Sequence, residues 1–393
     1  MSNDVYIISA VRTAIGDFGG GLKDLAPAEL GRIVVAEAIH RAGLAPSDVE
    51  HVVLGQVIPS EPQDAYLARV AAIRAGIPSA VPAMTLNRLC GSGVQAMVSG
   101  AQMIKLGECS TVVAGGVESM SRSPYVVASA RWGQRMGDAT MTDAMTSVLT
   151  DPFHYIHMGI TAENVAERCG ISRSTQDELA LESHHRAARA IAEGRFRKQI
   201  VPIEIKRRKE TVMFDTDEHP RPNLTIEELT QLKPVFNKSG TVTAGNASGI
   251  NDGAAAVTMM AAETAAARGI RPMARIVAWG HGGVDPDVMG LGPIPAVPIA
   301  LKRADLSLRQ IDVIESNEAF AAQACAVARE LGFDPARTNP NGSGIALGHP
   351  VGATGSILTV KCVYELQRTG GRYGLITLCI GGGQGIAMII ERF

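Results

Sequence analysis

Hydrophobic positions along the chain alternate between helical spacing and short continuous runs, the pattern of strands and helices that follow one another. The runs STVVAGGVESM and GLITLCIGGGQG are rich in apolar and β-branched residues and end in glycines, as buried strands that lead into tight turns do. Apolar residues at helical spacing follow a glycine-rich loop at Val94, Met97, Val98, Ala101 and Ile104. The pattern predicts an α/β fold.

An internal repeat organises these elements. The segment AIHRAGL at 38–44 resembles ALKRADL at 300–306, an offset of 262 residues (300 − 38), and each copy predicts a helix, a short loop and a buried strand. Further along, NRLCGSGVQAM and NPNGSGIALGHPVGATG both place Gly-Ser-Gly before an apolar helical segment. We therefore predict two copies of one strand–helix unit packed together, rather than chance similarity between amphipathic helices.

The stretch between the two copies has a different texture. It contains the helical segment TQDELALESHHRAARAIAEGRF, for which Thr175 to Glu178 is a candidate capping box. A stretch of 130 residues is too long for a plain loop, so we expect a cap domain over a site that both halves build. The predicted division is 1–119 for the first part of the N-terminal half, 120–249 for the inserted loop domain, 250–270 for the return of the N-terminal half and 271–393 for the C-terminal half.

Composition and charge restrict the class of protein. The 393 residues are 46% hydrophobic and 19% charged, enough for a large core. Lys and Arg number 37 against 39 Asp and Glu, so a nucleic-acid partner is not expected. The start lacks a signal-peptide pattern and charges, glycines or prolines interrupt every long apolar stretch, so we expect a cytoplasmic protein without a membrane partner. Six cysteines without a CxxC pair indicate reduced thiols rather than a disulfide scaffold or a zinc knuckle.

The first candidate for chemistry is Cys90 in NRLCGSG, just before a predicted helix. At a helix start the free N–H groups and the positive end of the dipole lower the pKa of a thiol, which makes it a nucleophile near neutral pH. The flanking glycines allow a carbonyl to approach closely. The alternative is an ordinary buried cysteine.

Three further candidates lie in the second copy. His349 occupies the glycine-rich turn GHPVGATG, which corresponds to the Cys90 turn, so a pseudo-twofold would bring base and thiol together. Cys379 follows a predicted strand, and Asn317 with Glu318 precedes a predicted helix. Taken alone, His349 fits a structural histidine and Cys379 a core thiol better than a catalytic role, and Asn317 with Glu318 fits a helix cap.

The remaining cysteines and histidines carry weaker signals. Cys109, Cys169, Cys325 and Cys362 lack glycine loops and are interpreted as inert thiols. Two histidines at 154 and 157 have metal-compatible spacing, but we do not expect a complete metal site there. No metal is expected.

Together the segments NRLCGSG, GHGGVDP, SNEAFAAQ, NPNGSGIALGHPVGATG and LCIGGGQG closely resemble the motifs of the thiolase family, in the family's order. The resemblance runs from VRTAIGDFGG to the last strand, and is greatest to bacterial acetyl-CoA C-acetyltransferases and β-ketothiolases. It implies the thiolase fold, with duplicated βαβαβαββ halves in a five-layered αβαβα arrangement and an inserted loop domain. In this family a stretch like SRSPYVVASARWGQRMGD mediates tetramer assembly, so a homotetramer, a dimer of dimers, is implied.

The resemblance also implies roles for individual residues. Cys90 is similar to the nucleophile that carries the acyl group, His349 to the histidine that activates it, and Cys379 to the base that removes an α-proton from acetyl-CoA. Asn317, through a water, and His349 would stabilise the enolate oxygen, while the N–H groups of Cys90 and Gly381 would hold the acyl-enzyme oxyanion. Contacts with coenzyme A are implied for His157, Met158, Arg221, Ala244, Ser248, Ala319 and Phe320, and positions on the pocket wall for Leu149 and Met289.

The activity implied is a reversible Claisen condensation of acetyl-CoA with acetyl-CoA or a short acyl-CoA. It gives 3-oxoacyl-CoA and CoA by a ping-pong route, as in the short-chain type that supplies polyhydroxyalkanoate precursors. Coenzyme A thioesters are substrates, and no cofactor is implied. Cys379 argues against a ketoacyl-synthase type of condensing enzyme, because decarboxylation needs no α-proton base. The alternatives are a longer-chain degradative 3-ketoacyl-CoA thiolase and a non-catalytic thiolase-like protein that binds acyl-CoA or lipid.

Overall fold

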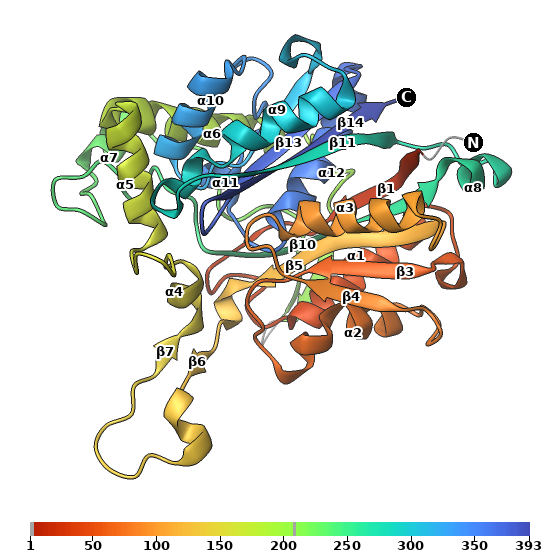
Figure 1. Cartoon of the computed structure of the whole chain (residues 1–393), viewed down its shortest axis with the longest axis horizontal. Helices are drawn as coiled ribbons and strands as arrows, with labels where there is room; N and C mark the ends of the chain where they lie inside the picture. The colour runs from red at the N-terminus through yellow and green to blue at the C-terminus, as the bar shows by residue number, and fades with distance from the viewer. Residues whose placement is uncertain (1–3, 207–209) are drawn as a thin grey trace.

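The computed structural model describes residues 4–206 and 210–393, and its body consists of two similar α/β halves (Figure 1). The first half contains β1 (Val5–Arg12), β2 (Gly16–Asp17), α1 (Pro27–Arg41), β3 (His51–Gly55), α2 (Leu67–Arg74), β4 (Ala83–Leu86), α3 (Ser92–Lys105), β5 (Thr111–Ser119), β10 (Asn251–Ala261) and α8 (Ala262–Ala267). The second half contains β11 (Ala274–Gly283), α9 (Pro293–Ala304), β12 (Val313–Ser316), α10 (Ala321–Leu331), α11 (Gly344–Leu347), α12 (Thr354–Thr369), β13 (Tyr373–Ile380) and β14 (Gln384–Arg392).

The strand order repeats between the halves. The first half runs β1, β10, β5, β3, β4 and the second runs β11, β14, β13, β12. Directions repeat as well, because β3 with β5 and β12 with β13 are parallel pairs, whereas β5 with β10 and β13 with β14 are antiparallel. In the second half, the position that corresponds to strand β4 is occupied only by an isolated parallel bridge between Ile314 and Thr338. The duplication predicted from the segments at 38–44 and 300–306 is confirmed.

Five layers result from how the helices cover the strands. Helices α1 and α2 pack on the outer face of the first half, and α9 packs on the outer face of the second, with α10 beside it. Helices α3 and α12 contact each other between the halves, and α12 packs on strands of both (Figure 1). Strands covered on both faces become apolar throughout, which explains the continuous run of β5, every residue of which is buried.

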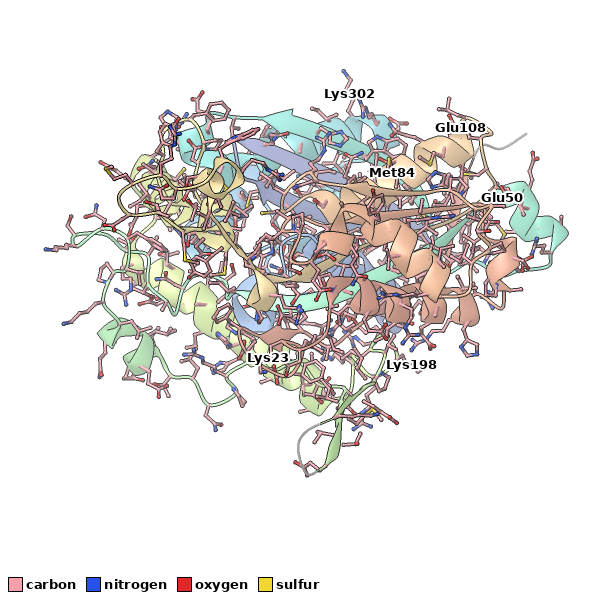
Figure 2. All side chains as sticks on the ribbon, turned by 90° about the horizontal axis from the view of Figure 1, so that it is seen from below. Lys23, Glu50, Met84, Glu108, Lys198 and Lys302 are labelled. Carbon is pink, nitrogen blue, oxygen red and sulfur yellow. The ribbon has the colours of Figure 1, made fainter. Side chains whose placement is uncertain are left out.

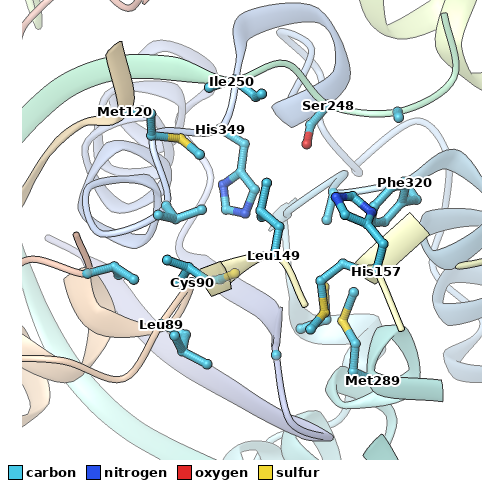
Figure 3. A pocket seen from close by; sticks show the side chains of 18 of the residues that line it. Leu89, Cys90, Met120, Leu149, His157, Ser248, Ile250, Met289, Phe320 and His349 are labelled. Carbon is cyan, nitrogen blue, oxygen red and sulfur yellow. The ribbon is translucent and has the colours of Figure 1, made fainter. Parts of the chain in front are cut away.

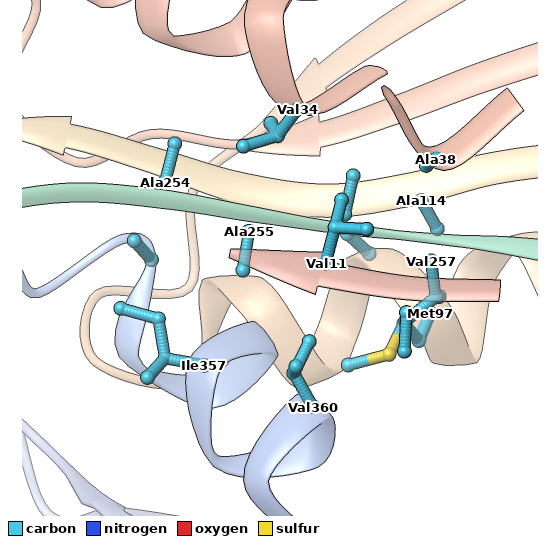
Figure 4. Packing of buried hydrophobic residues seen from close by; sticks show 14 of the residues in the cluster. Val11, Val34, Ala38, Met97, Ala114, Ala254, Ala255, Val257, Ile357 and Val360 are labelled. Atoms are coloured by element: carbon cyan, nitrogen blue, oxygen red, sulfur yellow. The ribbon is translucent and has the colours of Figure 1, made fainter. Parts of the chain in front are cut away.

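The core of the first half has this layered packing (Figure 4). Met97 of α3 and Val360 of α12 lie on one face of the strands, while Val34 and Ala38 of α1 lie on the other. All four side chains are fully buried. The two faces therefore belong to one continuous apolar cluster.

The two halves meet at a narrow seam. Strands β1 and β11 pair over only three residues, from Val5 with Ile276 to Ile7 with Ala274. Next to this seam the helices α3 and α12 touch at glycines. A Cβ added at Gly93 would lie 2.5 Å from the Ser356 nitrogen, and one at Gly355 would lie 2.6 Å from the Val94 nitrogen. Only glycine permits this approach, which brings together the starts of both helices and the turns that precede them.

The segment between β5 and β10 folds outside the two halves. It contains β6 (Tyr125–Val126), β7 (Thr142–Asp143), α4 (Ala144–Val148), α5 (Met158–Cys169), α6 (Arg173–Ala192), β8 (Ile203–Lys206), β9 (Thr211–Phe214) and α7 (Ile226–Gln231). The β6–β7 hairpin projects away from the body (Figure 1). A buried ion pair between Arg12 and Asp217, with 2.7 Å between nitrogen and oxygen, fastens the segment to β1.

One local prediction in this segment is wrong. The N-cap of helix α6 lies three residues before the expected one, because the Ser172 side chain caps the helix by accepting a hydrogen bond from the Thr175 nitrogen. Thr175 is the third residue of the helix, not its cap. Ser172 has the same capping chemistry as threonine, so the composition alone does not decide between them.

Charged side chains such as Glu108 and Lys302 lie at the surface (Figure 2). Within residues 4–206 and 210–393, no helix is both long and apolar enough to cross a membrane. The same residues contain no group of three or more His, Cys, Asp or Glu side chains arranged to hold a metal ion.

Candidate active site

Cys90 lies in a tight turn between β4 and α3. Leu89, just before it, has a φ of +47°, a conformation that a leucine rarely adopts. The Ser92 hydroxyl holds the turn, because it donates to the Leu89 carbonyl (2.7 Å) and accepts from the Arg88 nitrogen (2.8 Å). Such strain is concentrated at functional sites, where the surrounding structure maintains it. The turn places Cys90 in the wall of a cavity (Figure 3).

His349 lies in the corresponding turn of the second half. Gly348 has a φ of +102°, which favours glycine, and the His349 nitrogen donates to Asn251 Oδ1 at 2.9 Å. In the ring, Nδ1 lies 2.7 Å from Thr354 Oγ1, and Nε2 lies 3.4 Å from Asn317 Nδ2. The histidine is 5% exposed, so these neighbours rather than solvent determine its hydrogen bonding.

A buried carboxylate from the first half holds this histidine turn. Glu118, at the end of β5, accepts hydrogen bonds from the Gly352 nitrogen (2.8 Å) and from the nitrogens of Val57 (3.0 Å) and Ile58 (3.1 Å). Burial raises the pKa of Glu118 to about 8. Because Glu118 belongs to the half that carries Cys90, it links the position of His349 to that half.

Cys379 is the penultimate residue of β13 and is fully buried. The glycine turn that follows it brings the Gly381 backbone N–H to the Cys90 sulfur, where the N–H of Cys90 itself is the second donor. Two backbone donors that converge on one point form the type of site that holds an oxyanion.

One cavity of about 280 Å³ brings most of the predicted site residues together (Figure 3). Its walls are largely apolar, and both thiols and the imidazole face it. Eleven of the predicted residues line it: Cys90, His349, Cys379, Gly381, His157, Met158, Ser248, Ala319, Phe320, Leu149 and Met289.

Asn317 lies behind His349 rather than in the wall of this cavity. It is fully buried, and its Oδ1 has no hydrogen-bond partner among the described residues. The helix-cap alternative does not apply, because Phe320 is the N-cap of α10 and the helix has no side-chain cap. Glu318 instead accepts from Ser183 Oγ at 2.6 Å and from Asn339 Nδ2 at 2.8 Å.

Arg221 and Ala244, the remaining predicted residues, line a second and more open cavity of about 460 Å³. The two cavities share a set of wall residues, Phe236 and Ala247 to Ile250. The two cavities therefore adjoin, with the more open one next to the cavity that contains the thiols.

His157 lines the cavity that contains the thiols. Its Nδ1 accepts a hydrogen bond from the Gly159 nitrogen at 3.0 Å, so its Nε2 carries the proton and can donate to a ligand. The ring stacks on Phe236, with 4.7 Å between centroids. Burial lowers the pKa of His157, which keeps the ring neutral. The neutral ring, with its donor free, suits a ligand amide or carbonyl.

The pKa values of the central groups correct one prediction from the sequence. Burial raises the pKa of Cys90 to about 11, although the two backbone N–H groups act in the opposite direction. The expected lowering at a helix start was wrong, because Cys90 lies before the Gly91 N-cap in an apolar cavity and desolvation exceeds the effect of the helix. Burial raises the pKa of Cys379 further and lowers that of His349 to about 4. All three groups are therefore neutral near pH 7.

Sequence reasoning missed several residues of the site, among them Thr354, Phe236 and Glu118. Thr354 lies inside the quoted motif GHPVGATG, so its hydroxyl five positions after the histidine was an available signal. Phe236 and Glu118 reach the site from distant parts of the chain, and no local pattern marked them.

The duplicated α/β body, with two thiols and an imidazole in the wall of one cavity, is the arrangement expected of an acyltransferase of the thiolase type. Residues 5–263 match the family model for the thiolase N-terminal domain, and residues 270–392 match that for the thiolase C-terminal domain. The chain belongs to the thiolase family.

Similar proteins cover the whole chain. It is 61% identical to beta-ketothiolase BktB of Cupriavidus necator over 393 residues, all of both chains. It is 51% identical to an acetyl-CoA acetyltransferase of Pseudomonas aeruginosa, over 99% of both. The crystal structure of the Bacillus anthracis acetyl-CoA acetyltransferase superposes with a TM-score of 0.97 at 49% identity over 100% of both chains. Human mitochondrial 3-ketoacyl-CoA thiolase in complex with CoA gives 0.96 at 45% identity, over 99% of this chain and 98% of that one.

Proposed function

We propose that this protein is an acetyl-CoA C-acetyltransferase, a β-ketothiolase that condenses acetyl-CoA with acetyl-CoA or a short acyl-CoA. The products are a 3-oxoacyl-CoA and free CoA, and the reaction is reversible. The observation that carries the proposal is the single cavity lined by Cys90, His349 and Cys379. The printed names of the relatives at 61% and 51% identity support the same activity.

The first half-reaction acylates Cys90. Its proton moves to His349 Nε2, and the sulfur attacks the thioester carbonyl of the first acyl-CoA. The negative charge that develops on the carbonyl oxygen lies near the N–H groups of Cys90 and Gly381. The CoA thiolate then leaves and takes the proton from His349, so that the enzyme carries an S-acyl cysteine and CoA departs as a thiol.

The second half-reaction forms the carbon–carbon bond. Cys379 gives its proton to His349 and, as a thiolate, removes an α-proton from acetyl-CoA. The protonated Nε2 and the Asn317 amide stabilise the enolate oxygen, in our proposal with a water between amide and substrate. The enolate carbon attacks the acyl group on Cys90, whose sulfur leaves and recovers a proton from His349. Every group returns to its starting protonation state.

Short acyl groups suit the inner cavity. Its volume of about 280 Å³ must hold the end of the pantetheine arm as well as the acyl group. Leu149 and Met289 line its wall and would limit the length of the acyl group. Arg221 and Ala244 at the outer cavity would receive the nucleotide end of coenzyme A, and Met158, Ser248, Ala319 and Phe320 would enclose the pantetheine. The chemistry requires no metal or prosthetic group.

We also propose assembly into a homotetramer in the cytoplasm. Trp132 and Met136, in the β6–β7 hairpin, are 89% and 90% exposed on a projection of the chain, which is typical of an assembly surface. All six cysteines are free, which suits a reducing compartment.

Replacing each thiol in turn tests the reaction. Cys379→Ser is expected to keep Cys90 acylation, seen as release of one CoA per site and an acetylated Cys90 peptide, while condensation and thiolysis are lost. Cys90→Ala should lose acylation as well. Cys109→Ser, at a half-buried thiol away from the cavity, is the control and should keep full activity. Full activity of Cys90→Ala would overturn the proposed function, and normal condensation by Cys379→Ser would remove the base from Cys379.

A further inference from the structure

We propose that Thr354 is a positioning residue that fixes the tautomer and orientation of His349, so that its basic nitrogen faces the reacting atoms. The inference rests on the proposed function, in which His349 accepts the Cys90 proton. It concerns a hydroxyl that touches neither thiol and does not line the cavity.

The hydrogen bonds of Thr354 determine which ring nitrogen carries the proton. Thr354 Oγ1 lies 2.9 Å from the Pro350 carbonyl, which can only accept, and we assign the single hydroxyl proton to this contact; the backbone nitrogens of Ala353 and Thr354 donate to the same carbonyl. The same oxygen lies 2.7 Å from His349 Nδ1 and in this assignment accepts from it. Nδ1 therefore bears the proton, and the lone pair lies on Nε2.

The arrangement is fixed by its surroundings. Thr354 is the first residue of α12, and its backbone nitrogen also donates to the Pro350 carbonyl, at 2.9 Å. Its side chain has almost no contact with solvent, since the residue is 2% exposed. Water cannot replace the hydroxyl without a rearrangement of the turn, so the ring has one well-defined partner on its Nδ1 side.

This geometry serves both protonation states that the reaction needs. In the neutral ring, Nε2 is unprotonated and can take a proton from Cys90, while Asn317 Nδ2 at 3.4 Å donates weakly toward it. In the imidazolium, Nδ1–H remains on Thr354 and Nε2–H is free to donate to an enolate oxygen. The opposite tautomer would direct the lone pair at Thr354, where no proton is to be moved.

The test uses a pair of substitutions that differ in the hydroxyl. Thr354→Val keeps the shape and removes the hydroxyl, whereas Thr354→Ser keeps the hydroxyl. In the full-length protein, kcat for thiolysis of acetoacetyl-CoA by Thr354→Val should fall about tenfold or more, with little change in KM. This factor corresponds to the loss of one buried hydrogen bond. Thr354→Ser should stay close to the wild type. Circular dichroism shows whether the valine variant folds. If it does not fold, Thr354→Ala is measured in its place.

A second readout separates positioning from a structural role. The rate of Cys90 alkylation by iodoacetamide reports the reactivity of the sulfur. In the wild type and Thr354→Ser the imidazole takes the thiol proton as the sulfur attacks, so alkylation at one fixed pH near 7 should be faster than in Thr354→Val.

The outcomes distinguish the inference from the function it rests on. A wild type that does not cleave acetoacetyl-CoA overturns the proposed function. An active wild type with equal kcat and equal alkylation rates in the valine and serine variants overturns the role of Thr354. A folded valine variant that is slow in both assays, with activity restored by serine, supports it.

Discussion

Replacing Gly93 by alanine should separate the two helices that position the nucleophile and the histidine. The added methyl group would lie 2.5 Å from both the nitrogen and the hydroxyl oxygen of Ser356, and 3.2 Å from the Gly355 carbonyl carbon. The backbone nitrogen cannot rotate away as a side chain can. Helices α3 and α12 must therefore move apart.

The size of the effect follows from these distances. Atoms of this kind are in favourable contact at about 3.5 Å, so a contact of 2.5 Å requires a shift of about 1 Å. Overpacking of this type costs about 1–3 kcal/mol of stability, partly offset by the better helix propensity of alanine. A displacement of about 1 Å between reacting groups costs about 10²-fold in rate. We therefore expect kcat/KM to fall far more than the fraction of folded protein.

The assay is thiolysis of acetoacetyl-CoA at saturating and limiting substrate, together with urea denaturation of the same preparations. Gly31→Ala is the matched control, because its methyl group would meet the Ala71 Cβ at 3.1 Å on the outer helix pair, away from the cavity. The control should retain wild-type activity. If Gly93→Ala keeps the kcat/KM of the wild type, the contact between the helices does not control the distance between the two turns.

Two other outcomes follow from the buried ionisable groups. In His349→Ala, which removes the imidazole, alkylation of Cys90 by iodoacetamide should rise about tenfold per pH unit between pH 7 and 9, because burial raises the pKa of the thiol to about 11, above this range; a level rate would contradict the raised pKa. Lys361→Met should lower the free energy of unfolding by about 3–5 kcal/mol, because it leaves Glu315 buried without the ammonium that lies 2.7 Å from it. Adding Glu315→Leu should recover most of this loss in urea denaturation, and an unchanged unfolding midpoint in the single variant would contradict the pairing.

Much of the fold could be predicted from the sequence, because the duplication is visible as two similar segments. The segments at 38–44 and 300–306 identify corresponding helices, and the glycine turns around Cys90 and His349 occupy equivalent places in the two copies. Because the two turns occupy equivalent places in the two copies, we could expect them to lie close together. The five-layered arrangement was predicted from the resemblance to thiolases. The spacing of hydrophobic residues does not indicate which faces of two sheets pack against the same helices.

The electrostatics of the site could not be predicted in the same way. The position of Cys90 beside a helix start is local and suggests a low pKa, but its burial depends on walls from distant segments, such as Met120 and Ile250. Desolvation by these walls reverses the direction of the shift. Tertiary packing also places Phe236 against the ring of His157 and Glu118 behind the histidine turn. Local sequence patterns do not predict such contacts.

The division of the reactive groups between the halves also has a consequence for synthesis of the chain. A ribosome releases the nucleophile's half long before the residues beyond 348 that supply the imidazole and the second thiol. Until the last strand pair closes, the nascent polypeptide holds a sulfhydryl with no neighbour to take its proton. An unfinished or truncated copy therefore lacks the imidazole and the second thiol that the proposed condensation requires.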